Sequence, residues 1–352
     1  MIILKLILTF ITLAFLSPTV VFASCVGLGA DERLENYCLV SALNGATVTK
    51  TDLLSIDHRL RREGYKDGLG VQGATPVDNL STSFSLTPIF RYEDNINGGN
   101  SPQPLVVGSL RFIGDENFHK QSGVLVGLNA GLGGRYIYDQ GRYLNYNLGT
   151  GYAQSFESGI GVVNHNASVC SVNHIAKRWY VDACADQIRE RKELMDATNS
   201  NVKLIGSHIF SSPTQQHKQV KFGINRYLTD AYQQNQFQFS IKTTHPQGMV
   251  TGIDTTFGEA VSEQLATQFS VAGNVGFYFA KKPIRIFATY HRSTGGLLLG
   301  FDRNSNTTSI SVSYPVWRNF ITTLGYSKTD SNIDYFDVSG PSLDVQFAAI
   351  QF

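Results

Sequence analysis

The chain has 352 residues, a formal net charge of +1 and only 16% charged residues. This balance argues against nucleic acid as a partner, because no basic excess is available to neutralise phosphates. A soluble chain of this length would usually form two domains and carry about 25% charged residues. The low charge, the 22 Phe and 16 Tyr and the 33 Gly instead suit a membrane β-barrel with aromatic girdles and tight turns.

The first 23 residues have the pattern of a secretory signal peptide. Lys5 precedes an apolar stretch from Leu6 to Leu16, and Val21 and Ala23 stand at positions −3 and −1 of an expected cleavage site. We therefore expect cleavage after Ala23. Two alternatives remain open, namely an uncleaved membrane anchor and lipoprotein processing at Cys25.

Residues 24–79 are expected to form a short periplasmic segment ahead of the barrel. Thr51 and Asp52 can cap a helix that runs to about Glu63 and is followed by Gly64. This helix has an apolar face and a basic face. We interpret it as a solvated periplasmic helix, and the alternative is a plug or a helix that docks a partner.

From Leu80 to Phe352, apolar and polar residues alternate in runs separated by Gly, Asn, Asp and Pro. Since successive side chains of a strand point to opposite faces, one face can meet lipid while the other lines a wet lumen. No apolar stretch after residue 23 is long enough for a membrane helix, so only a closed barrel could span a bilayer. The prediction is an all-β, transmembrane antiparallel β-barrel of about 14 strands over residues 80–352. A soluble secreted β-protein is the alternative.

The individual runs number one more than an even count allows, whereas single-chain bacterial barrels have even strand numbers. One run is therefore wrong, or two merge. Residues 159–200 are the least regular, and we interpret the charged stretch at 186–194 as a strand with lumen-facing charges rather than a loop helix. The last run changes phase between Phe347 and Ile350, which requires a bulge or a lumen-facing Phe347. The predicted strands are 80–93, 104–114, 122–138, 142–156, 159–171, 178–194, 201–211, 217–230, 234–245, 248–260, 264–280, 283–294, 306–317, 319–330 and 341–352.

Four cysteines follow the expected signal peptide, and in an exported chain an even count predicts disulfides. Pairing neighbours along the chain closes two loops of about 14 residues, each worth roughly 3 kcal/mol in the chain-entropy model. His165 and His174 flank one of the cysteines, so a zinc site is the less favoured alternative. The predicted bonds are Cys25–Cys38 and Cys170–Cys184.

A search for catalytic chemistry yields one pair. His291 and Ser293 stand two residues apart on a predicted strand, so they share a face, as a lipid-hydrolysing barrel would require. No second motif accompanies them, and the Gly-rich segment 127–134 lacks the Lys-Ser/Thr and the helix of a phosphate loop. We predict no enzyme, no catalytic, cofactor-binding or metal-binding residues, and no cofactor.

Two segments resemble the barrel domain of the surface lipoprotein assembly modifier family. Residues 90–97, Phe-Arg-Tyr-Glu-Asp-Asn-Ile-Asn, are similar to the motif that opens that barrel, and residues 324–337 resemble the hairpin that precedes its last strand. Asn and Asp hydrogen-bond their own backbone and tolerate left-handed conformations, so we expect the matched residues to shape turns. These residues are Asp94, Asn95, Asn97, Asp330, Asn332 and Asp334.

The resemblance implies an outer-membrane barrel that helps to move proteins or lipoproteins to the cell surface. Family members carry a long N-terminal array of tetratricopeptide helices, and only about 55 residues stand between the signal peptide and this barrel, so recognition of a cargo is in doubt. The predicted function is an integral outer-membrane barrel of the transport class that assists protein or lipoprotein export. Its expected partners are outer-membrane lipid and an exported cargo. The alternatives are a passive or substrate-selective diffusion pore and, less favoured, a lipid-modifying enzyme.

Overall fold

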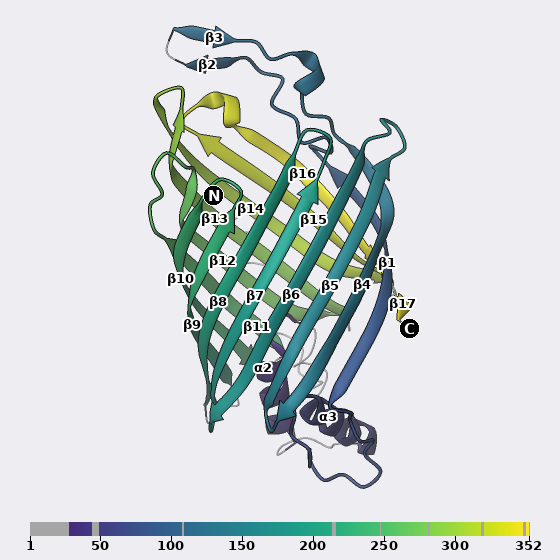
Figure 1. Ribbon diagram of the computed structural model, residues 1–352. Helices are drawn as coiled ribbons and strands as arrows, with labels where there is room; N and C mark the ends of the chain where they lie inside the picture. Colours follow the sequence, from purple (N-terminus) through teal and green to yellow (C-terminus); the bar gives the residue numbers. More distant parts are fainter. Residues whose placement is uncertain are drawn as a thin grey trace.

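The computed structural model describes residues 28–43, 49–107, 109–212, 216–246, 248–280, 282–317, 320–347 and 350–351. They form a closed antiparallel β-barrel with two helices at one end and a long loop at the other (Figure 1). The predicted signal peptide, residues 1–23, lies outside the described residues. No helix among the described residues is long and apolar enough to cross a bilayer.

Two α-helices precede the strands, and short connections join most neighbouring elements along the chain. Two short 3-10 helices, Glu116–Phe118 and Asp334–Phe336, lie in loops. The α-helices are α2 (Glu32–Ala42) and α3 (Lys50–Arg62), and the strands are β1 (Leu80–Glu93), β2 (Leu105–Val107), β3 (Leu110–Phe112), β4 (Gly123–Asp139), β5 (Arg142–Ser155), β6 (Gly161–Ala176), β7 (Trp179–Arg191), β8 (Asp196–Ser211), β9 (His217–Thr229), β10 (Gln233–His245), β11 (Met249–Gly258), β12 (Ala266–Phe279), β13 (Lys282–Leu298), β14 (Phe301–Trp317), β15 (Phe320–Ser331), β16 (Val338–Phe347) and β17 (Ile350–Gln351).

The barrel wall has 14 strands, as predicted. Strands β4 to β16 pair in chain order, and β16 and β17 both pair with β1, so they are two parts of one barrel strand. The predicted strand at 104–114 is wrong, because β2 and β3 form a separate two-stranded hairpin outside the barrel sheet. In the sequence, Gly108-Ser109 divides this run into pieces too short to cross a membrane. Without this segment, the predicted strands number 14, which is even.

The barrel closes where the last strand meets the first. Residue Val345 of β16 pairs with Phe90, whereas Ile350 of β17 pairs with Leu86, so five residues on one strand correspond to four on the other. This extra residue is the irregularity that the phase change of the last run predicted. It allows Val345 and Ile350 to share the outer face.

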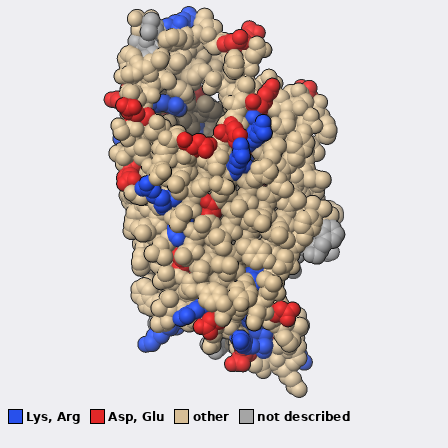
Figure 2. All heavy atoms as spheres, in the orientation of Figure 1, with Lys and Arg blue, Asp and Glu red and all other residues tan. Residues whose placement is uncertain are grey.

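The two faces of the wall differ in chemistry, as period-two alternation requires. Near the middle of the wall the outward side chains are large and apolar, and they include Leu132, Leu148, Leu204 and Ile224, all exposed. On the face shown in Figure 2, charged side chains lie mainly toward the two ends, and the wall around β4–β6 carries few of them. This is the surface expected to face lipid.

The segment before the barrel contains two described helices, where the sequence predicted one. Thr49 caps α3 with a reciprocal capping box to Asp52, and Gly64, with a φ of +90°, follows its end, so the expected helix at 51–63 is present within one or two residues. The second helix, α2, begins at the N-cap Asp31, whose side chain accepts a hydrogen bond from Leu34 N. The start of this helix contacts the inner face of the barrel wall.

The connections define two ends of the barrel. At the end where β1 begins, which we call the helix end, the connections between strands are short. At the opposite end, the loop end, residues 94–122 form the longest connection and carry the β2–β3 hairpin (Figure 1). The helices α2 and α3 lie at the helix end (Figure 1).

Candidate functional site

The lumen is the candidate site, and its wall is lined mainly by uncharged hydrogen-bonding side chains. One side of the lumen, formed by β13–β16 and β1, is rich in hydroxyl groups, and neighbouring hydroxyls bond across strands, for example Thr289 with Ser309 at 2.6 Å and Ser313 with Thr323 at 2.8 Å. The other side is rich in amides. The lumen-facing amides include Asn164, Asn166, Asn199, Asn201, Asn225, Gln234, Gln236 and Gln238.

Helix α2 is held in this lumen by ion pairs to the wall. Asp31 lies 2.7 Å from Lys221 of β9, and Glu32 lies 2.7 Å from Arg135 of β4. Burial acts to raise the pKa of Asp31, but the Lys221 ammonium group outweighs it and holds that pKa below its usual value. Three consecutive charged residues of the helix therefore each face an opposite charge on a different strand, the third being Arg33.

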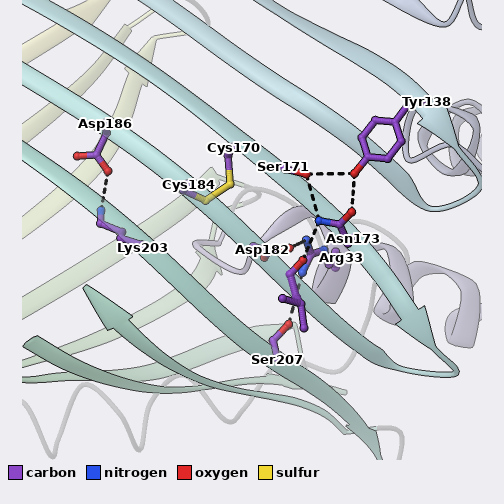
Figure 3. The surroundings of a disulfide bond; sticks show 11 residues. Arg33, Tyr138, Cys170, Ser171, Asn173, Asp182, Cys184, Asp186, Lys203 and Ser207 are labelled. Atoms are coloured by element: carbon purple, nitrogen blue, oxygen red, sulfur yellow. Dashed lines mark hydrogen bonds and ion pairs between the residues drawn. A yellow bond between two sulfur atoms is a disulfide. The ribbon is translucent and has the colours of Figure 1, made fainter. Parts of the chain in front are cut away.

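Arg33 makes the most buried of these contacts. Its guanidinium lies 2.6 Å from Asp182 of β7 and 3.4 Å from Ser207 of β8 (Figure 3). The guanidinium also lies 4.3 Å from the centre of the Tyr180 ring. Arg33 and Asp182 are 6% and 8% exposed. Removing one partner of such a pair leaves an uncompensated buried charge, which typically costs about 3–5 kcal/mol.

The chain before α2 extends these contacts across the lumen. The Gly29 carbonyl accepts a hydrogen bond from Lys242 of β10 at 3.3 Å, and Leu28 packs against Gly276 of β12 so closely that no Cβ would fit there. Residues 28–43 thus contact strands from β4 to β12. We call residues 28–43 and 49–70 the plug.

Helix α3 joins α2 at the mouth of the barrel. Arg59 pairs with Glu35 at 3.1 Å, and Ile56 packs against Leu39 in a small apolar cluster. Asp57 is fully buried and accepts hydrogen bonds from Arg61 and from Leu69 N, which outweigh the effect of burial and lower its pKa. The two helices and the turn after α3 are therefore one packed unit.

The loop end is narrowed by the start of the 94–122 loop. Ile96 is fully buried and packs against the lumen-facing Leu125, Ala153 and Val162. Lys192 reaches the same place, where it pairs with Glu93 and donates to Asn95 O at 2.8 Å. In Figure 2 a hollow below the β2–β3 hairpin is rimmed by acidic and basic side chains.

The residues matched to the family motifs hold loops together. Asn95 exchanges hydrogen bonds with the Gly99 backbone, and the buried Asn97 accepts from Gly99 N and Gln121 N and donates to His119 O. Asn332 accepts a hydrogen bond from Asn304 N and donates to Asp302 O, both near the start of β14. Of the remaining three, Asp94 pairs with Lys120 at the other end of the 94–122 loop, and Asp330 pairs with Lys328 within β15. Asp334 begins the 3-10 helix before β16.

Of the predicted disulfides, Cys170–Cys184 is present (Figure 3). It joins two directly paired residues of β6 and β7, so Cys170 is not free to bind zinc. Among the described residues, no group of three or more His, Cys, Asp and Glu side chains is placed to hold a metal ion. The predicted Cys25–Cys38 bond involves Cys25, which lies outside the described residues.

Residues 186–191 belong to β7, so most of the charged stretch 186–194 is a strand, as interpreted from the sequence. Asp186 and Glu190 face the lumen, whereas Arg189 and Arg191 lie on the outer face. Asp186 pairs with Lys203 at 2.8 Å. Sequence reasoning did not identify Arg33, Arg135, Asp182 and Lys221 as a group. The two members of each ion pair are at least 103 residues apart along the chain, and the only local signal is a charged side chain at a lumen-facing position of a strand.

His291 and Ser293 do contact each other, with 2.8 Å between Ser293 Oγ and His291 Nε2. Both side chains face the lumen, since they pair with Ser270, Thr267, Thr307 and Ser305 on the inner face. Lipid chains lie on the outer face, so this pair is not placed to attack membrane lipid.

A closed barrel with an apolar outer surface and a polar interior is the architecture of bacterial outer-membrane proteins. The chain is an outer-membrane β-barrel. No protein-family model matches it. Comparison with curated proteins finds no match.

Several solved structures of outer-membrane barrels are distantly similar to this chain. Pseudomonas putida OprB, in a high-pH structure, is 7% identical with a TM-score of 0.43, and the alignment covers 78% of this chain and 94% of that one. A loop-deletion mutant of the Vibrio cholerae outer-membrane protein OmpT is 9% identical with a TM-score of 0.41, over 78% and 100% of the two chains. The outer-membrane protein OprD of Pseudomonas aeruginosa is 9% identical with a TM-score of 0.39, over 78% and 94%. Likeness at this level transfers neither a solute nor a mechanism.

Proposed function

We propose that the protein is a diffusion channel for small, polar, mostly uncharged solutes, closed at its helix end by the plug. The observation that carries the proposal is a lumen lined by hydroxyl and amide groups, in which most of the buried charge is paired with the plug. Hydroxyl and amide side chains both donate and accept hydrogen bonds, so they suit hydroxylated solutes. Unpaired charges in a narrow lumen would instead select ions.

The geometry also suggests how the barrel is oriented. Outer-membrane barrels have short periplasmic turns and longer extracellular loops. The helix end, with its two-residue turns between β4 and β5 and between β6 and β7, corresponds to the periplasm. The plug would then enter the lumen from the periplasmic side, and the 94–122 loop would meet solutes outside the cell.

The experiment is single-channel conductance of the full chain in planar bilayers. The Arg33→Asp variant places two carboxylates together in a buried site and should release the plug, so we expect conductance well above that of the unaltered protein. The matched control is the exchange of charges, Arg33→Asp with Asp182→Arg, which restores an opposite pair and should restore the closed state.

Two outcomes would count against the proposal. If no variant conducts, including one that lacks residues 24–79, the barrel is not a diffusion channel. If all variants conduct equally, the plug does not close it. Vesicle-swelling rates with a neutral sugar and a similarly sized organic acid then test the solute class, and we expect the neutral sugar to enter faster.

Assisted export of a protein or lipoprotein is the second candidate, and it rests on the family resemblance. The motif residues that carry this resemblance form loop contacts at both sides of the loop end, so they are compatible with either function. Export predicts that deleting the gene strands a specific surface protein in the periplasm while solute entry is unchanged. The channel proposal predicts the reverse.

A further inference from the structure

A cavity lies between the plug and the barrel wall at the helix end. Its volume is about 330 Å³, which is within the range of small-molecule sites. Asn36 and Tyr37 of α2 and Glu63 and Tyr65 at the end of α3 form one side, and His174 of β6 and Tyr180 of β7 form the other. A molecule in this cavity would therefore contact the plug and the barrel wall at the same time.

Two buried polar groups, the Glu63 carboxyl and the Asn36 amide, lie next to each other in the cavity wall. Glu63 is 5% exposed and Asn36 is 2% exposed, and neither Glu63 Oε1 nor Asn36 Nδ2 makes a hydrogen bond of good geometry, although the Asn36 amide is close enough to lower the pKa of the Glu63 carboxyl. Buried polar atoms are normally satisfied, because burying an unpaired one costs about 1–3 kcal/mol. The two groups satisfy each other poorly, and a ligand that brings a positive charge to Glu63 frees the Asn36 amide to donate to the ligand.

The charge around the cavity favours a cation. Arg33 is paired with Asp182 and Arg135 with Glu32, so neither is free to neutralise Glu63. Burial, reinforced by the neighbouring Glu32, raises the pKa of Glu63 to about 7, although Arg33, Arg135 and the Asn36 amide act in the opposite direction. Near neutral pH the carboxyl group can thus ionise fully once a positive charge arrives beside it.

Aromatic rings form the rest of the wall. The Tyr65 hydroxyl lies 3.2 Å from His174 Nδ1, the Tyr180 hydroxyl donates to that of Tyr37 at 3.4 Å, and the His174 and Tyr180 rings stack at 5.0 Å. His174 Nε2 lies 2.6 Å from Lys177 O, which places its proton on Nε2 and leaves Nδ1 to accept from Tyr65. Aromatic faces beside a carboxylate are the groups that recognise ammonium compounds.

We propose that this cavity binds a small organic ammonium compound that also carries a hydroxyl or carbonyl group. Its ammonium group pairs with the Glu63 carboxylate, its oxygen accepts from Asn36 Nδ2 in place of Glu63, and its methylene groups lie against Tyr37 and Tyr65. Because the ligand contacts plug and barrel together, it binds the seated plug more tightly than the released one and stabilises it. Only this last consequence rests on the proposed channel function.

The test uses choline with the full chain in detergent, followed by isothermal titration calorimetry. The neutral carbon isostere of choline, 3,3-dimethyl-1-butanol, is the ligand control. We expect choline to bind at least tenfold more tightly than the alcohol, and Glu63→Gln to lower choline affinity at least tenfold. The matched variant Glu157→Gln, in an exposed connection at the loop end, should leave it unchanged. Three results would overturn the proposal. They are the absence of choline binding, equal affinity of the protein for choline and the alcohol, and equal affinity of the unaltered protein and Glu63→Gln for choline.

Glu63→Gln could lose choline binding because it misfolds. A second measurement therefore uses only the unaltered protein and records how its affinity for choline depends on pH. Affinity should rise as pH increases through 7, where the carboxylate forms, and a flat profile contradicts the proposal. Adding choline during conductance separates the two proposals, because binding without an effect on current leaves the site standing and removes its link to the channel. The groups facing Glu63 are Glu32, Arg33, Tyr37, Tyr65, Asp67, Arg135, Tyr143, His174, Tyr180 and Asp182.

Discussion

At the scale of single residues, Glu63 makes seating of the plug depend on pH. The pKa of this carboxyl group is about 7 when it is buried and 4.5 in its ordinary state, so the seated plug binds an extra proton between these values. Plug stability is therefore greatest below about pH 4.5, falls as pH rises to about 7 and is constant above that. The loss is on the order of 3 kcal/mol.

This pH effect can be measured by limited proteolysis of residues 28–79 at pH 5 and pH 8. We expect faster cleavage at pH 8, and a Glu63→Gln variant should be cleaved at the same rate at both pH values. If the unaltered protein and the variant respond to pH alike, another group is responsible.

The Cys170–Cys184 disulfide is a second single-site feature with a measurable effect. The bond closes a loop of 14 residues and should stabilise the barrel by up to about 3 kcal/mol through the unfolded state. Replacing both cysteines by Ser should lower the urea midpoint of unfolding in detergent. Serine variants are preferable to a reductant, which would act on every cysteine. An unchanged midpoint would mean that strand pairing alone accounts for the stability here.

At the scale of elements, the 94–122 loop depends on one apolar anchor. Ile96 is fully buried against β4, β5 and β6, and truncating a buried Ile to Ala costs about 2–5 kcal/mol. Ile96→Ala should release the loop at the loop end and speed its cleavage by added protease in whole cells. The barrel should stay folded, and Ile113→Ala, at an exposed position of the same loop, should have no effect. Equal cleavage of the two variants would contradict the anchoring role.

The two helices show which elements can be recognised from local sequence. Helix α3 has a capping box, an apolar stripe and a terminal glycine, and all three are local signals. Helix α2 has charged residues at its start because the lumen wall supplies their partners. The helix also buries Leu34 and Leu39, but the polar Arg33, Glu35 and Asn36 are buried with them, so no clear apolar stripe marked α2 in the sequence.

At the scale of the whole molecule, the alternation of faces predicts opposite costs for charges at adjacent positions. Leu132 faces outward near the middle of β4, while Gly133 faces the lumen, where an added Cβ meets nothing closer than 3.8 Å. Lysine at the lipid face near the bilayer midplane costs about 2–4 kcal/mol. Leu132→Lys should therefore reduce folding into lipid vesicles, and Gly133→Lys should fold normally. If Gly133→Lys folded less well than Leu132→Lys, the lipid-facing and lumen-facing sides of the wall would be assigned wrongly.

The strands were predictable because each one has an apolar face toward lipid and a polar face toward the water-filled lumen. A period of two with an aromatic-rich apolar face is required wherever a strand separates lipid from water, so it appears in the sequence strand by strand. The one wrong strand, at 104–114, alternates for a different reason, because it forms a hairpin in a loop. Alternation alone does not distinguish these cases.

The barrel, its strand number within one, its lipid-facing residues, helix α3 and the Cys170–Cys184 pairing could all be predicted from the sequence, because they follow from periodicity, caps and spacing along neighbouring stretches of chain. The position of α2 in the lumen, the contact between Arg33 and Asp182, and the cavity lined by Glu63, Asn36 and Tyr180 became known from the folded structure alone. Those contacts join residues far apart in the chain, and their energy comes from charges buried together, which no local pattern records.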